Sequence, residues 1–160
     1  MLDIPSISAI VAALGLIVGV VLAMLELRNV AKRRQMELIL NIYSSFGTRE
    51  YVDAWEKIRT RETKDYNEYI KEYGWADVTQ VSSVFEGLGV LLRRKFLDID
   101  LVRELLSEST KMTWEKVKPI IEDARRQIAQ RKIGEYIPVY QSWEYLYNEM
   151  KKREQQLAIQ

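Results

Sequence analysis

The chain has 160 residues, enough for one domain, with 24 Lys and Arg against 23 Asp and Glu. Its pI is about 7.8 and charges of both signs are interspersed, which argues against a nucleic-acid partner, because such proteins gather positive charge into a patch. The absence of Cys and His excludes disulfides, thiolate metal sites and catalytic sets built on either residue within one chain, and no cofactor motif is present.

The first predicted element is an apolar helix from Ile4 to Leu25, a run that carries no ionisable side chain. At 1.5 Å per residue this run spans about 33 Å as a helix, which matches a hydrocarbon core about 30 Å thick. We therefore predict a transmembrane anchor over residues 1–26. A cleaved signal peptide and the core helix of a soluble protein are the alternatives. The signal peptide is disfavoured because Asp3 makes the N-terminal flank acidic.

The charges that flank this run predict its orientation. Only Asp3 and the α-amino group precede it, whereas four cations follow within ten residues: Arg28, Lys32, Arg33 and Arg34. The positive-inside rule then places the C-terminal part in the cytoplasm of a single-pass protein of the cell membrane. The same four side chains are candidates for contact with anionic lipid headgroups.

Small residues recur every four positions within the run, at Gly15, Gly19 and Ala23. This spacing places them on one helix face, where close backbone approach favours helix association in lipid, although small residues are also common in membrane helices generally. The pattern predicts a homo-oligomer. Glu26 follows the run, and its expected place is at the headgroup level or, in an oligomer, in an acidic ring at a pore mouth.

After the anchor, apolar residues recur at intervals of three and four, which predicts helices throughout. We expect an all-α fold, in which the first helix continues without a break to Phe46 and ends at Gly47. Residues 27–47 are thus an extension of the anchor, and residues 48–152 form a cytoplasmic multi-helix bundle. Thr48 is expected to cap the next helix, and Gly74 to end the one after it.

The boundaries of the later helices are predicted from Asp and Pro residues. Asp77 is expected to cap the most apolar helix, over residues 78–95, which is the predicted centre of the core. Asp98 or Asp100 then begins a short helix that ends at Leu106. A separate helix covers residues 113–132, where Pro119 either starts the main part or kinks it. Pro138 opens the last helix, and residues 153–160 form a polar tail that frays.

Few residues qualify as chemical candidates. Glu86 and Glu144 lie among predicted core residues, so structural ion pairs are expected for them. The available partners are Arg93, Arg94, Arg125 and Arg126. The pair Asp98 and Asp100 lacks the glycine of a calcium loop and is better explained by helix capping. The Gly87-Leu88-Gly89 segment lacks the Lys-Ser/Thr of a phosphate loop, and its glycines are better explained by tight helix packing.

Several segments together resemble a known family, the domain of unknown function DUF4760. They are the apolar N-terminal helix followed by Arg33-Arg34, the stretch from Val84 to Gly89 that continues into Phe96–Asp100, Trp114 with Pro119 and Arg125, and Ile137-Pro138 with Trp143–Leu146. The resemblance covers about Ala31 to Met150. It implies a membrane-anchored helical domain with Glu86 and Glu144 in a shared framework, and it implies no activity.

Two functions follow from these features. The first is a membrane-tethered interaction or scaffold module that self-associates and binds an unknown protein partner. The second is a homo-oligomeric channel or pore, which is weakened by the lack of polar residues in the middle of the apolar run. An enzyme acting through carboxylates alone is disfavoured, because the sequence offers no recognisable catalytic set.

Overall fold

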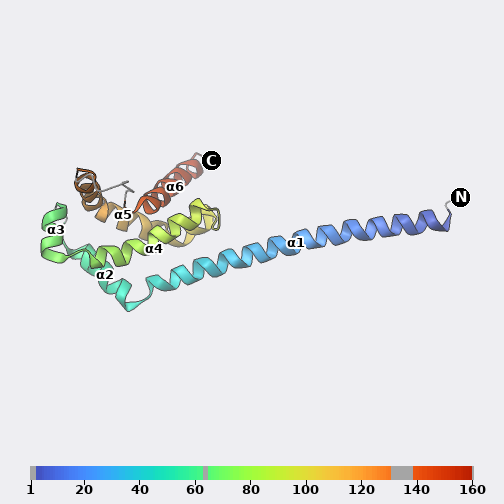
Figure 1. Cartoon of the computed structure of the whole chain (residues 1–160), viewed down its shortest axis with the longest axis horizontal. Coiled ribbons are helices and arrows are strands. Elements are labelled where there is room, and N and C mark those ends of the chain that lie inside the picture. The colour runs from blue at the N-terminus through green and yellow to red at the C-terminus, as the bar shows by residue number, and fades with distance from the viewer. Residues whose placement is uncertain (1–2, 63–64, 131–138, 160) are drawn as a thin grey trace. The chain divides into compact units, whose positions relative to one another are not determined.

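The fold is all-α, as the sequence predicts. The computed structural model describes residues 3–62, 65–130 and 139–159, apart from the side chains of residues 4–11, and this part contains helices and no strand. The helices in chain order are α1 (Ile4–Phe46), α2 (Arg49–Thr60), α3 (Tyr66–Tyr73), α4 (Ala76–Arg93), α5 (Ile99–Gln130) and α6 (Gln141–Leu157) (Figure 1). The chain divides into two compact units, Met1–Glu37 and Leu38–Gln160.

The first unit consists of most of α1. No Pro or Gly occurs between Gly19 and Phe46, so nothing in this stretch interrupts the helical hydrogen bonds, and α1 continues past the apolar run as expected. Within the described residues it is the one helix that is long and apolar enough to cross a membrane, judged by length and composition. None of its most apolar window is buried. Large apolar side chains are therefore exposed along it, among them Leu14, Leu16, Ile17 and Leu22.

The second unit has its own apolar core, in which α4 is the central helix. Helix α4 packs mainly against α6 and α2, while α5 packs against α6 and α3. Val78, Val81, Phe85 and Leu88 of α4 are fully buried, in agreement with the prediction that this segment is the centre of the core. The unit begins at Leu38, so the end of α1 belongs to the folded domain, whereas the sequence places the domain boundary at residue 48.

Local signals predicted two helix ends correctly. The Thr48 hydroxyl accepts a hydrogen bond from the amide of Tyr51 (3.3 Å) and caps α2. Gly74 ends α3 with a φ of 72°, a conformation that residues with a β-carbon adopt only at a cost.

The predicted cap of α4 is wrong. Helix α4 begins at Ala76 after Trp75, which makes no side-chain capping bond, and Asp77 lies in the first turn. The Asp77 carboxylate instead pairs with two cations, Arg61 just after α2 at 2.8 Å and Lys57 of α2 at 3.4 Å. Because the helix begins one residue before Asp77, this carboxylate lies inside the first turn and pairs with these cations rather than capping the helix.

The predicted break between residues 106 and 113 is also wrong, because α5 is one helix of 32 residues. Asp98 begins it, since its carboxylate accepts from the amides of Asp100 (2.8 Å) and Leu101 (3.4 Å). Pro119 lies within α5 on its exposed side, where water can hydrate the backbone carbonyl that proline leaves unpaired. The predicted end at Lys132 and the predicted start at Pro138 lie outside the described residues.

The C-terminal segment does not fray where the sequence predicts a tail, because α6 extends to Leu157. Arg153 donates to both carboxylate oxygens of Asp100 on α5, at 2.6 and 2.7 Å. Glu154 accepts from the Ser107 hydroxyl (2.7 Å) and from Lys111 (3.1 Å). Hydrogen bonding by Arg153 lowers the pKa of Asp100, and hydrogen bonding by Ser107 and Lys111 lowers the pKa of Glu154. These contacts dock the last turns of α6 onto α5.

Candidate functional site

The small residues of α1 lie on a face that is open. Gly15, Gly19 and Ala23 share one side of the helix, since four residues advance it by slightly more than one turn. A β-carbon added at Gly15 or Gly19 would meet nothing within 4 Å, and Ala23 is exposed. The charged residues that follow on α1 are exposed as well: Glu26, Arg28, Lys32, Arg33 and Arg34.

Glu86 of α4 caps the N-terminus of another helix, α6. From α4, its carboxylate accepts hydrogen bonds from the backbone amides of Ser142 (3.1 Å) and Trp143 (2.8 Å), which belong to the first turn of α6. These amides have no partner within their own helix, and the positive end of the helix dipole favours a negative charge there. The sequence predicts an ion pair with arginine for Glu86, and the structure instead places it against backbone amides.

Arg125 and Glu144 form the ion pair that the sequence proposes for them. Nη1 of Arg125 lies 2.7 Å from Oε2 of Glu144, and both side chains are largely covered. The remaining guanidinium nitrogens donate to the carbonyl of Val139, from Nε at 3.0 Å and from Nη2 at 2.8 Å. Arg125 therefore ties α5 both to the first turn of α6 and to Val139, two residues before that helix begins. Together with Glu86, this pair forms a structural clamp on the start of α6.

Removing the Glu86 carboxylate tests this clamp. Glu86→Ala should lower the free energy of unfolding by about 2 kcal/mol, because two backbone amides lose a charged acceptor. Glu86→Gln should cost about half as much, since the amide oxygen still accepts a hydrogen bond. Urea unfolding followed by circular dichroism measures both. The control, Glu104→Ala, removes an exposed carboxylate from a loose pair at 3.9 Å and should change stability by less than about 0.5 kcal/mol. Equal losses in all three variants would contradict the clamp.

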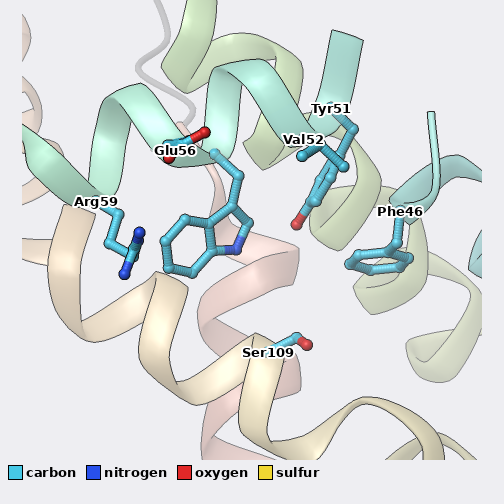
Figure 2. Close-up of a pocket in the computed structure, with 7 residues that line it drawn as sticks. Phe46, Tyr51, Val52, Glu56, Arg59 and Ser109 are labelled. Atoms are coloured by element: carbon cyan, nitrogen blue, oxygen red, sulfur yellow. The ribbon is translucent and has the colours of Figure 1, made fainter. Parts of the chain in front are cut away.

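A pocket of about 350 Å³ opens between α2 and α5, and we call it the α2/α5 pocket (Figure 2). Helix α2 supplies most of its lining, with Phe46 from the end of α1 and Ser109 from α5. The α2 residues are Tyr51, Val52, Trp55, Glu56 and Arg59. In Figure 2 the rings of Tyr51 and Phe46 lie on one side of the pocket and Arg59 on the other, and Ser109 faces them from α5.

The sequence does not reveal this pocket. Tyr51, Trp55 and Arg59 are spaced four residues apart, a pattern that an ordinary helix face also shows. Trp55 is only half-buried, and the Arg59 guanidinium lies 5.9 Å from the centre of its ring. In the sequence, the one signal for this pocket is an arginine one helical turn after two aromatic residues. Ser109 lies 50 residues further on, and only the fold brings it to the pocket.

A second hollow, of about 490 Å³, lies between α3 and α5 and is polar. Its Asp123 is already engaged: the carboxylate accepts from the amide of Tyr66 (2.8 Å), which lowers the pKa of Asp123. No group of three or more Asp or Glu side chains suited to a metal ion occurs in residues 3–62, 65–130 and 139–159. The described part of the chain thus offers an aromatic pocket and a structural clamp.

The fold and these features define an all-helical domain that follows a long apolar N-terminal helix. Residues 9–150 match the model of the family described as Domain of unknown function (DUF4760), and the chain belongs to this family. The match confirms the resemblance and extends it into the apolar helix. No curated protein matches the chain. No solved structure matches it either.

Proposed function

We propose that this protein is a membrane-tethered interaction module with no catalytic role of its own. In this proposal α1 crosses the cell membrane once, and the domain that starts at Leu38 binds a protein partner in the cytoplasm. The observation that supports it is an apolar helix whose most apolar window is unburied, continuous with the first helix of a domain that has its own apolar core. A buried core helix would have its apolar side chains covered, and these are exposed.

The cations after the apolar run support the orientation. Arg28, Lys32, Arg33 and Arg34 are exposed within three turns of the end of that run, where positive charge favours the cytoplasmic side. Each of them gains about 1 kcal/mol near an anionic membrane surface. A tether raises the local concentration of the domain at the membrane, so weak contacts with a partner are sufficient for binding there.

Extraction of membranes at alkaline pH tests the tether. Alkaline carbonate strips peripheral proteins but leaves a spanning helix in lipid, because its apolar side chains remain buried there. The full chain should stay in the membrane pellet. Recovery of the chain in the supernatant would reject the proposal.

The proposal also includes self-association of the chain through α1. The open face of Gly15, Gly19 and Ala23 lets a second α1 approach closely in lipid. Gly15→Leu with Gly19→Leu should reduce the detergent-solubilised particle to the mass of a monomer, because the added side chains separate the helices. Light scattering coupled to gel filtration gives that mass.

The control adds bulk to the opposite face of the same helix. Ile17→Phe with Val21→Phe should leave the mass of the oligomer unchanged. An unchanged mass in the glycine variant, or a monomeric wild-type chain, would reject self-association through this face. A ring of seven or more copies that conducts ions in planar bilayers would instead favour the channel alternative.

A further inference from the structure

We propose that the α2/α5 pocket is a binding site for a small aromatic carboxylate. The apolar ring system of the ligand lies against Trp55 and Phe46, and its carboxylate accepts a hydrogen bond from the hydroxyl of Tyr51 (Figure 2). This inference is independent of the membrane tether, because every residue that lines the pocket belongs to the second unit.

The size and lining of the pocket suit a small ring system. Its volume of about 350 Å³ lies in the range of small-molecule sites, which runs from about 300 to 1,000 Å³. Phe46 packs edge-on against Tyr51, with ring centres 4.9 Å apart, and this fixes one aromatic wall. The half-buried ring of Trp55 and the exposed Val52 provide further apolar surface. Flat ligands bind such walls by stacking.

The Tyr51 hydroxyl provides the specific polar contact. Tyr51 is 3% exposed, and its hydroxyl has no hydrogen-bond partner among the described residues. A buried polar group without a partner costs free energy, which an incoming acceptor would recover. Burial raises the pKa of Tyr51, so the hydroxyl stays protonated and remains a donor at neutral pH. In Figure 2 the Tyr51 oxygen points toward the side of the pocket on which Ser109 lies.

The other polar groups favour a negatively charged ligand. Ser109 and Arg59 add a hydroxyl and a guanidinium to the Tyr51 donor, and the Arg59 guanidinium lies 5.9 Å from the centre of the Trp55 ring. Glu56 is the single carboxylate in the lining; Glu56 and Arg59 are both exposed, so water screens both charges. Tyr51, Ser109 and Arg59 can each donate a hydrogen bond to a carboxylate, whereas Glu56 is the one group in the lining that can only accept.

Calorimetric titration with 1-naphthoate tests the site. The full chain is held in phosphatidylcholine nanodiscs, because a detergent would compete for an apolar pocket, and the heats from empty nanodiscs are subtracted. Saturable binding with a Kd on the order of 0.1–1 mM is expected for a ligand of this size. The neutral 1-naphthamide should bind at least about threefold more weakly, because it lacks the charge that Arg59 and the donors favour.

Two matched pairs of variants locate the binding. Tyr51→Phe removes the hydroxyl and should weaken 1-naphthoate by about threefold to tenfold. Tyr69→Phe removes a hydroxyl from an equally buried tyrosine outside the pocket and should have no effect. Val52→Trp fills the mouth of the pocket and should abolish saturable binding. Val90→Trp, at a similarly exposed valine on α4, should leave it unchanged.

The following results would overturn the inference: no heat above that of empty nanodiscs, equal affinity for both naphthyl probes, or wild-type affinity in both Tyr51→Phe and Val52→Trp. Circular dichroism shows whether each variant folds. If Tyr51→Phe fails to fold, Val52→Trp decides the outcome, because its side chain is exposed and the substitution leaves the core intact.

Discussion

A chain carrying Leu14→Arg and Val18→Arg is expected to leave the membrane pellet and to appear in the soluble or aggregated fraction. Both side chains are exposed in the apolar part of α1. An arginine near the centre of a spanning helix costs about 2.5–3.5 kcal/mol on the insertion scale, so the two together cost about 6 kcal/mol. Alkaline extraction followed by immunoblotting measures the fraction retained.

The control for this experiment carries the same two charges on the same helix beyond the apolar run. Leu40→Arg with Tyr43→Arg changes two exposed residues near the end of α1. This variant should stay in the membrane pellet, since the proposal places these positions in water. Equal retention of both double variants would show that the apolar run does not lie in lipid.

Gly89→Ala is expected to destabilise the domain by about 3 kcal/mol or more. Helices α4 and α6 approach so closely here that a β-carbon on Gly89 would fall on the backbone carbonyl of Ser142. The backbone of the first turn of α6 cannot move away freely, because Glu86 holds the amides of Ser142 and Trp143. Overpacking of this kind typically costs 1–3 kcal/mol, and a clash with backbone lies at or beyond the upper end.

Gly87 provides the matched control two residues earlier in α4. A β-carbon there would meet nothing within 4 Å, and the residue is exposed. Gly87→Ala should therefore stabilise the domain by about 0.5–1 kcal/mol, because alanine loses less backbone entropy than glycine in a helix. Urea unfolding of the two variants should thus move in opposite directions. A loss of less than 1 kcal/mol in Gly89→Ala would contradict the close contact of α4 with α6.

The elements that the sequence predicted correctly are those with local causes. The continuation of α1 past the apolar run follows from the absence of Pro and Gly between Gly19 and Phe46, the Thr48 cap reaches three residues ahead, and the Gly74 stop is set by its own φ. The apolar periodicity of α4 likewise sufficed to identify the centre of the core. Each of these signals lies within a few residues of its effect.

The predictions that were wrong depend on partners far away in sequence. Asp77 pairs with Lys57 of α2 and with Arg61 just after it, and the last turns of α6 are held by Asp100 and Ser107 of α5. Glu86 finds its two amides 56 and 57 residues later. Asp and Glu residues that look alike in the sequence thus cap a helix, form an ion pair or bind the amides of another helix. Only the tertiary fold decides which of these roles each one has.

The candidate pocket was missed for the same reason. Its α2 residues are regularly spaced and look like a buried face, and Ser109, which lines the opposite side, comes from α5. A single sequence carries no signal for an unfilled volume between two helices. The unpaired Tyr51 hydroxyl is likewise a property of the fold, since tyrosine in a helix is ordinary.

Cysteine labelling of intact cells tests the central claim most directly, because the chain has no cysteine of its own. Single variants at Asp3 and Asn148, both exposed positions, are treated with a membrane-impermeant maleimide before and after the cells are broken. Asp3→Cys should react in intact cells, whereas Asn148→Cys should react only after the membrane is opened. Reaction of Asn148→Cys in intact cells, or protection of both positions there, would contradict a single α1 crossing with its domain in the cytoplasm.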